Sequence, residues 1–364
     1  MARGYKICVV APSHWAANFG GAEFQIRLLL DALLEHSAVK ITYLARHVSQ
    51  NHVDSRYCTR QIRSFKPLSR LGFWPDLPFL IRLLRQEQPD VIYQRVGCAY
   101  TGICAAYARV CGARLIWHIS IDNDLDRDMG RFHFLSRIVE RQLRDFGIRR
   151  ADTIVAQTHQ QAQVLGTRFG REAVVVKNFQ PPANHGNTKK RVPTVVWIAN
   201  LKPAKRPELF LELVRKTSQA LGIQFVMVGR GGDCEPYATL ISEAAKISQL
   251  IYVGEKTVEQ TNDLIASAHI LINTSIVEGF PNTYIQAWFR KTVVVSLDID
   301  PDGVLQKHDL GFVAKSPKAL ADIVEKLVRD DALRETTAGR ALNYATSEHG
   351  LDNADRLASI IVGK

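Results

Sequence analysis

Short apolar runs alternate with longer amphipathic segments along the whole chain, and this alternation restricts the fold more than any other feature. Runs that are apolar throughout are typical of strands buried on both faces, and strands separated by helices form parallel sheets. We therefore predict an α/β fold with two Rossmann-like, doubly wound domains facing each other across a cleft. The predicted strands cover residues 6–10, 40–44, 91–93, 114–117, 153–155, 173–176, 194–198, 224–228, 250–253, 270–272 and 292–295.

The alternation stops at residues 180–193, where proline, glycine, asparagine and charged residues replace it. A chain of 364 residues is long enough for about two domains, each with its own core. We therefore place the first domain at residues 1–182, the linker at 183–193 and the second domain at 194–345.

Positive charge is concentrated in the first half. Residues 1–185 contain 25 Lys and Arg against 15 Asp and Glu, a net charge of +10, whereas residues 186–364 contain 22 against 21, a net charge of +1. This asymmetry predicts an anionic partner for the first half, either a lipid surface or an acidic glycan. Nucleic acid is disfavoured because no zinc-finger or RNP-type signature accompanies the charge.

The chain carries neither a signal peptide nor an apolar run approaching the ~20 residues that span a bilayer. We expect a cytoplasmic protein, either free or peripheral on the cytosolic face of a membrane. Residues 131–150 and 70–85 mix arginines with large apolar residues. Each segment fits a membrane surface as well as it fits a core helix with a solvated basic face.

Residues 278–290 join a predicted strand to a helix in a way that suits an anionic ligand. Pro281 fits the first helical position, where a missing N–H costs nothing. The free N–H groups and positive dipole end of that helix form a seat for a phosphate. Glu278 before the helix and Gln286 within it would bond hydroxyls on either side of a diphosphate, as in a nucleotide-sugar. A loop with a solvated glutamate fits this stretch equally well.

Two other strand ends carry residues suited to an anion. Gly20 and Gly21 open a helix and let backbone amides approach a ligand, although a plain tight turn explains them equally. Lys205 and Arg206, with Lys202 nearby, precede a predicted helix start and would form charge-assisted bonds to a diphosphate. A solvated basic loop is the alternative.

His118 ends a predicted strand and is expected at the ligand-binding edge, although a structural histidine fits as well. Residues 122–128 are rich in aspartate, but Arg127 and His133 stand where a calcium loop needs glycine and glutamate. The six cysteines show no paired C-x-x-C spacing. We therefore expect reduced thiols, no disulfide and no bound metal.

In order and spacing, the motifs resemble those of a retaining glycosyltransferase of the GT-B fold, family four, over almost the whole chain. The motifs are Gly-Gly-Ala-Glu at 20–23, Trp-His at 117–118, Val-Lys-Asn at 176–178, Asn-Leu-Lys-Pro-Ala-Lys-Arg at 200–206, Val-Gly-Arg-Gly at 228–231, Val-Gly at 253–254 and Glu-Gly-Phe-Pro-Asn at 278–282. Only Glu-Gly-Phe-Pro-Asn is specific by itself.

The resemblance implies that the first domain binds the acceptor and the second binds a nucleotide-sugar donor, with no cofactor. Lys205 would bind the diphosphate, Glu278 would contact the donor sugar and His118 would hydrogen-bond it. A C-terminal helix at residues 346–364 would return to the first domain. The other donor-binding positions implied are Gly20, Gly21, Asn200, Arg206, Gly229, Gly254, Gly279, Phe280, Pro281, Asn282 and Gln286.

Two positions depart from the family pattern. Gln286 replaces a second glutamate, and Asn200 stands where an arginine is common. A glutamine still bonds hydroxyls without charge, and the lost arginine leaves more of the phosphate charge to Lys205.

The predicted function is transfer of a hexose from a nucleoside diphosphate sugar to a hydroxyl of a glycan or lipid-linked acceptor, with retained anomeric configuration. The expected setting is cell-surface polysaccharide synthesis. One alternative is a protein that binds nucleotide-sugars without catalysis. Another is a nicotinamide-dependent oxidoreductase, disfavoured because the Gly-x-Gly-x-x-Gly fingerprint is missing.

Overall fold

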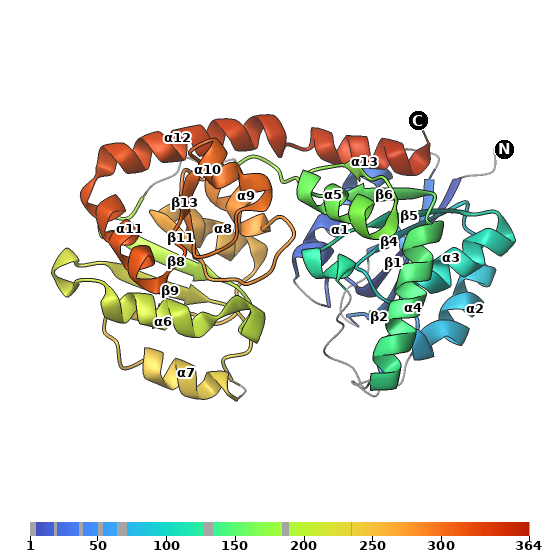
Figure 1. Cartoon of the computed structure of the whole chain (residues 1–364), viewed down its shortest axis with the longest axis horizontal. Helices are drawn as coiled ribbons and strands as arrows, with labels where there is room; N and C mark the ends of the chain where they lie inside the picture. Colours follow the sequence, from blue (N-terminus) through green and yellow to red (C-terminus); the bar gives the residue numbers. More distant parts are fainter. Residues whose placement is uncertain are drawn as a thin grey trace. The chain divides into compact units, whose positions relative to one another are not determined.

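The computed structural model describes residues 5–17, 20–35, 39–49, 54–63, 71–126, 134–183, 189–233 and 235–363. The chain divides into two compact units, Met1–Phe179 with Leu351–Lys364, and Gln180–Gly350 (Figure 1). Within the described ranges, no helix is both long and apolar enough to cross a membrane. Several positions of the sequence motifs lie outside the described residues, namely Arg70, Arg127, Arg131, His133, residues 184–188 and Cys234.

The first unit is built on a parallel sheet whose described strands follow the order β3-β2-β1-β4-β5-β6-β7. The central strands are almost fully buried, which explains their continuous apolar sequences. Strand bounds are β1 (Tyr5–Ser13), β2 (Val39–His47), β3 (Cys58–Gln61), β4 (Val91–Arg95), β5 (Arg114–His118), β6 (Thr153–Ala156) and β7 (Val174–Val175).

Side chains that alternate along each strand enter two cores, one on each face of this sheet. On β1, Ile7 and Val9 pack in one core with α1 (Gly21–Leu34) and α13 (Asp352–Val362). Cys8 and Val10 pack in the opposite core. The helices near that opposite core are α2 (Leu77–Glu87), α3 (Ala99–Cys111), α4 (Phe134–Arg150) and α5 (His159–Phe169).

The C-terminal helix α13 is anchored in the first unit. Its residues Leu357 and Ile361 are fully buried in the core that they share with α1. Arg114 Nη2 donates to the carbonyl oxygen of Ile360, 2.6 Å away, which places a cation at the negative end of the helix dipole.

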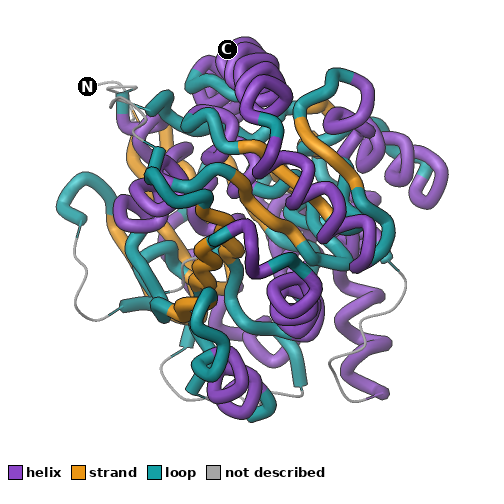
Figure 2. Tube along the Cα trace, turned by 90° about the vertical axis from the view of Figure 1, so that its left-hand side faces the viewer, coloured by secondary structure: helices purple, strands orange, loops and turns teal. Residues whose placement is uncertain are grey.

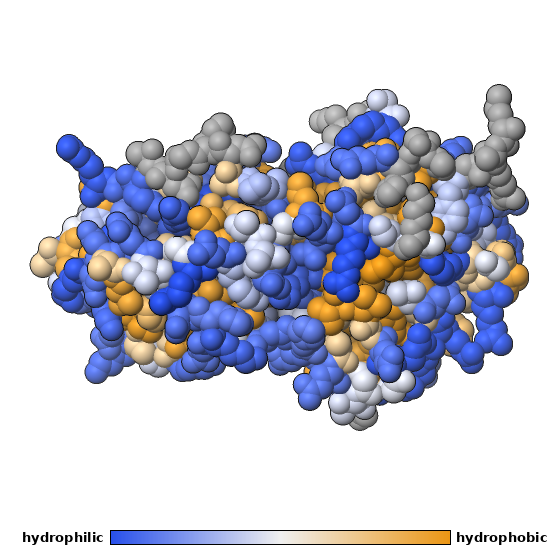
Figure 3. Space-filling view, turned by 90° about the horizontal axis from the view of Figure 1, so that it is seen from above, coloured by the Kyte–Doolittle hydropathy of each residue, from blue (hydrophilic) through white to orange (hydrophobic). Residues whose placement is uncertain are grey.

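The second unit repeats the design with the described strand order β10-β9-β8-β11-β12-β13, again entirely parallel. In both units helices flank the strands (Figure 2). The outer face drawn in Figure 3 is mostly hydrophilic, with apolar residues between. The strands are β8 (Thr194–Ile198), β9 (Gln224–Val228), β10 (Leu250–Tyr252), β11 (Ile270–Asn273), β12 (Val293–Ser296) and β13 (Gly311–Val313).

Two cores again fill the two faces. Trp197 of β8 packs with Phe210 of α6 (Pro207–Lys216) and Leu320 of α11 (Pro317–Arg329). Val196 faces the other way, in a core with Ile265 and Trp288. That second core is covered by α8 (Val258–Ser267), α9 (Asn282–Phe289) and α12 (Asp331–Glu348), while α7 (Tyr237–Ala244) and α10 (Val304–Lys307) lie nearer the sheet edges.

The predicted α/β class with two Rossmann-like sheets is confirmed, and every predicted strand occurs within three residues of its expected bounds. The edge strands β3 and β13 escape the prediction because they are short and only partly buried. One position is corrected. Pro281 has extended backbone angles and caps the helix, so α9 begins at Asn282 rather than at the proline.

Candidate functional site

In the second unit, the loops after β8, β9 and β11 meet at the carboxyl edge of the sheet. The peptide N–H of Ile276 donates to Ala204 O over 2.9 Å, and that of Leu201 donates to Arg230 O over 2.8 Å. The carboxyl edge of a parallel sheet is where such folds bind ligands. Most of the predicted donor-binding residues lie on these three loops.

Lys205 and Glu278, predicted to contact different parts of the donor, form an ion pair with each other. Lys205 ends the short 3-10 helix η3 (Pro203–Lys205), and Glu278 lies between β11 and α9. Their side chains keep 24% and 15% of their surface exposed, so solvent reaches both charges. The structure therefore places a cation and a carboxylate side by side at the carboxyl edge.

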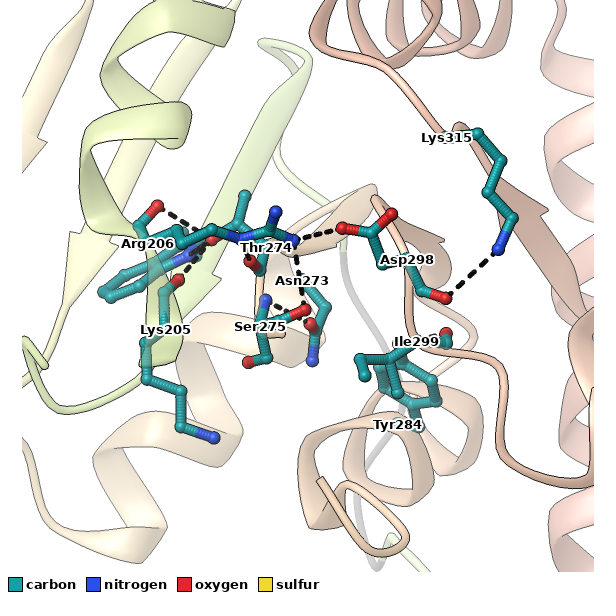
Figure 4. A network of polar contacts seen from close by, with 10 residues as sticks. Lys205, Arg206, Asn273, Thr274, Ser275, Tyr284, Asp298, Ile299 and Lys315 are labelled. Atoms are coloured by element: carbon teal, nitrogen blue, oxygen red, sulfur yellow. Dashed lines mark hydrogen bonds and ion pairs between the residues drawn. The ribbon is translucent and has the colours of Figure 1, made fainter. Parts of the chain in front are cut away.

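Arg206, next to Lys205, bonds to other residues of the second unit (Figure 4). Its Nε donates to Thr274 O over 2.6 Å, its Nη2 donates to Ser275 O over 3.2 Å, and it forms an ion pair with Asp298. A left-handed φ of 48° turns the chain at this residue, between η3 and α6. The guanidinium thus ties the loop after β8 to the loops after β11 and β12.

Thr274 reinforces the same junction. Its Oγ1 accepts the indole N–H of Trp197 over 2.9 Å and lies 2.6 Å from Lys205 O. The backbone that carries Lys205 is therefore held by a buried hydroxyl on β11's end, which keeps the lysine close to Glu278.

The predicted glycine positions of the second unit need glycine for different reasons, namely a close backbone approach at Gly229 and a left-handed backbone conformation at Gly254. At Gly229 a Cβ atom would lie 1.8 Å from Ala199 O, so only glycine allows the β8 and β9 loops to approach this closely. Gly254 has a left-handed φ of 70° with open space around it. Asn200 Oδ1 accepts the N–H of Arg230 over 3.4 Å, so this side chain supports the loop after β9.

The start of α9 leaves main-chain donors without a side-chain cap. Gly279 and Pro281 lie in the turn that leads into this helix, of which Asn282 is the first residue, while the ring of Phe280 is buried between Trp288 and His349. Uncapped N–H groups at a helix start favour an anion. The predicted phosphate seat at this helix start stays a prediction; the helix begins on the same sheet edge as the Lys205–Glu278 pair.

Gln286 lies inside α9 and is buried. Its Nε2 donates to Asn262 Oδ1 on α8 over 2.9 Å, so the amide links two helices of the second unit. Predicting this link would have required knowing that α8 and α9 lie side by side.

His118 ends β5 in the first unit and is almost completely buried. Its Nδ1 lies 2.7 Å from the hydroxyl of Tyr93, while Nε2 is buried without a hydrogen-bond partner. Burial, followed by the nearby charge of Arg95, lowers the pKa of His118 well below its ordinary value. The ring is therefore neutral at physiological pH.

Sequence reasoning missed the residues around His118. Tyr93 and Arg95 lie on β4 with the spacing of two that puts them on one face, and Arg95 pairs in register with His118. Arg95 Nη2 donates to Asn178 Oδ1 over 3.3 Å. An arginine inside an apolar strand is a signal that the sequence could have supplied.

Gly20 and Gly21 occupy the start of α1 in the first unit. Gly20 is the N-cap, with no side-chain cap, and Gly21 is the first helical residue. Farther along α1, Gln25 exchanges two hydrogen bonds with the backbone of Phe179, which fastens the helix to the segment after β7.

Possible metal ligands do not gather in the described residues: no group of three or more His, Cys, Asp or Glu side chains could hold a metal ion. The cysteines Cys8, Cys58, Cys98, Cys104 and Cys111 are free thiols. Burial raises the pKa of Cys98 and Cys104, so neither is a reactive thiolate.

Family models match both units. A model described as glycosyl transferase 4-like domain matches residues 1–178, and one described as glycosyl transferases group 1 matches residues 192–330. No curated protein sequence matches the chain.

Solved structures share the fold at low sequence identity. Sucrose-phosphate synthase from Thermosynechococcus elongatus has a TM-score of 0.78 at 13% identity, covering 99% of this chain and 98% of its own. HepE from Anabaena, in complex with UDP and glucose, has a TM-score of 0.76 at 16% identity, covering 99% of each chain. WaaG, a glycosyltransferase involved in lipopolysaccharide biosynthesis, has a TM-score of 0.75 at 12% identity, covering 98% of this chain and 100% of its own.

Proposed function

The chain belongs to the group 1 glycosyltransferases of the GT-B type, and from this we propose that it transfers a hexose from a UDP-sugar to a hydroxyl group with retained anomeric configuration. The observation that carries the proposal is the Lys205–Glu278 pair beside the uncapped start of α9. The complex of HepE with UDP and glucose supports uridine as the base and a hexose as the sugar.

In the proposed reaction, negative charge develops on the leaving diphosphate and positive charge on the sugar ring. The Lys205 ammonium and the N–H groups of α9 oppose the first charge, and such preorganised groups supply the largest share of many rate enhancements. Glu278 holds hydroxyls of the sugar. The configuration is kept because the acceptor attacks on the face that the diphosphate leaves.

The test is transfer from UDP-glucose, UDP-galactose and UDP-N-acetylglucosamine to alkyl glycosides, followed by UDP release and by the anomeric proton coupling of the product. Lys205→Ala should lose about 100- to 1,000-fold in turnover, as expected for one removed transition-state donor. Lys216→Ala, which removes a half-exposed lysine of α6, is the matched control and should keep full activity.

We also propose that the enzyme needs no metal, so EDTA should leave its rate unchanged. Full activity of Lys205→Ala, an inverted product, or a rate abolished by EDTA would each contradict the proposal. Binding of UDP-sugars with no transfer to any acceptor would favour the non-catalytic alternative.

For the acceptor we propose a glycan or lipid-linked saccharide at an anionic membrane surface in the cytoplasm, in polysaccharide synthesis. The role of WaaG in lipopolysaccharide biosynthesis supports this class. In the first unit, an open apolar groove of about 580 Å³ runs between α2 and α4, lined by Trp74, Pro75, Leu77, Pro78, Val139, Gln142 and Leu143. Phe134 and Leu135 are exposed at the start of α4, with Arg137 and Arg141 on the same helix.

Apolar side chains among arginines suit the boundary of an anionic bilayer. Full-length protein should therefore sediment with vesicles of phosphatidylglycerol and phosphatidylcholine at low salt, and Leu135→Glu should release it. Val110→Glu is the control, since Val110 is an equally exposed apolar residue on α3 of the same unit, at 84% against 74% for Leu135. Wild-type protein that stays in the supernatant, or release by both variants alike, would contradict membrane binding.

A further inference from the structure

His118 meets two side chains of the neighbouring strand that limit where its ring proton can lie. Tyr93 and Arg95 project from β4 on the face toward which His118 projects from β5, because Arg95 and His118 are register partners and Tyr93 is two residues earlier. The Tyr93 hydroxyl is 2.7 Å from Nδ1, and Arg95 Nη1 is 3.5 Å from the same atom.

A guanidinium only donates hydrogen bonds, which fixes the direction of this network. Arg95 hydrogen-bonds the Tyr93 hydroxyl, so the tyrosine oxygen accepts there and its own proton is free to point at His118. A proton on Nδ1 would face both this hydroxyl proton and the guanidinium. Nδ1 is therefore the acceptor, and the single proton of the neutral ring lies on Nε2.

The burial of Arg95 is the second observation. The side chain is 1% exposed, its Nε has no hydrogen-bond partner, and the partners that the structure describes for it are neutral: Tyr93, His118 and Asn178. A buried cation without a carboxylate is costly to fold around. Such local conflicts are expected where function requires them.

We propose that Tyr93 and Arg95 are positioning residues that hold His118 as the neutral tautomer with its proton on Nε2. Nε2 is a buried donor without a partner, and leaving a buried donor without a hydrogen bond costs free energy. A hydroxyl of the donor sugar would relieve that cost. This last step rests on the proposed function, whereas the tautomer does not.

The electrostatic environment agrees with the assignment. Burial lowers the pKa of His118, and the charge of Arg95 acts in the same direction. Burial raises the pKa of Tyr93, so its hydroxyl keeps its proton at neutral pH. Val155, the register partner of His118 on β6, carries no charge.

The experiment is long-range nitrogen–proton NMR on the full chain labelled with 15N-histidine, with His118→Gln to assign the signal among the 11 histidines. Wild type should show a neutral ring protonated at Nε2 throughout pH 5.5–8. Tyr93→Phe should yield a mixture of tautomers. Arg95→Met should raise the pKa of His118 above its wild-type value, because one of the two causes of the lowering is removed, whereas Arg95→Lys should keep it low.

Tyr107→Phe is the matched control, since it deletes another buried hydroxyl of the same unit, one that donates to Leu84 O. It should leave the His118 signals unchanged. With UDP-sugar, Tyr93→Phe should lose about five- to tenfold in kcat/KM, the value of one hydrogen bond. The acid limb of activity should move to higher pH in Arg95→Met alone.

A wild-type ring protonated at Nδ1, or one that titrates near pH 6.5, would overturn the proposal, as would unchanged tautomers in Tyr93→Phe. If Arg95→Met fails to fold, the Tyr93→Phe and Arg95→Lys spectra still decide the matter. A His118 Nε2 signal that does not move with saturating UDP-sugar would instead contradict the sugar contact, and with it this part of the proposed function.

Discussion

At the residue scale, the ion pair of Lys205 and Glu278 joins the two charged residues of the candidate site in the second unit. The sequence assigns one residue to the diphosphate and the other to the sugar, and the structure joins them. Because both side chains are partly exposed, the pair is screened by solvent and is open to competition by a doubly charged phosphate. We therefore propose that Glu278 lowers the affinity of the lysine for a diphosphate until the donor separates the two.

Arg206 shows why a basic loop is hard to interpret from sequence. Three cationic residues lie within residues 202–206, and nothing in their order says which one faces solvent. The structure directs Arg206 to Thr274 O, Ser275 O and Asp298. Lys205 then remains as the cation of this loop closest to the carboxylate, a choice that depends on contacts between distant segments.

At the element scale, the C-terminal ends of α8 and α9 are joined by one lysine from within the predicted linker, residues 183–193. Lys189 Nζ donates to Ala268 O at 2.6 Å, to Arg290 O at 3.0 Å and to Thr292 Oγ1 at 2.8 Å. Unpaired carbonyls at helix ends are satisfied in this way. The lysine thus fixes α9, whose other end carries the proposed phosphate seat.

This arrangement predicts a pH-dependent stability. Burial, and then the charge of Arg334, lower the pKa of Lys189 to about 7. The unfolded chain holds the same proton up to about pH 10.4. Between these values the unfolded state binds more protons, so the stability rises with pH through this window. Below it the buried ammonium costs stability, and that cost falls away as the amine loses its proton.

Urea unfolding of wild type and Lys189→Met at pH 7 and pH 9.5 measures this contribution. The wild type should gain stability relative to the variant as the pH rises, while Lys190→Met, altered at the next residue, should keep the wild-type slope. Equal slopes for wild type and Lys189→Met would show that the buried lysine keeps an ordinary pKa.

At the scale of the whole molecule, sequence periodicity predicted both parallel sheets, because strands buried on two faces must be apolar throughout. Two kinds of feature could not be predicted. Edge strands such as β3 and β13 lack that constraint, since one side of each is open. Contacts between segments far apart in sequence, such as Gln286 with Asn262 or Arg95 with Asn178, become visible only when the topology is known.

The candidate site divides along the same line. The positions of His118, Lys205 and Glu278 near strand ends could be predicted from the sequence, because the carboxyl edge of a parallel sheet collects such residues. Their roles stay predictions. Tyr93 was missed because it lies inside a strand, and Arg95 because the predicted strand stops at residue 93 although β4 continues to Arg95. The partners of both residues become visible only when β4 and β5 are paired.

The central proposal is that a diphosphate binds at Lys205 in competition with Glu278. Isothermal titration calorimetry of the full chain with UDP tests this proposal, because two variants should change the affinity for UDP in opposite directions. Lys205→Ala should weaken binding about tenfold or more, as for a lost charge-assisted hydrogen bond, and Glu278→Gln should strengthen it. Lys216→Ala and Glu243→Gln, at exposed ion pairs, should leave the affinity unchanged. UDP binding to Lys205→Ala with wild-type affinity would contradict the central claim.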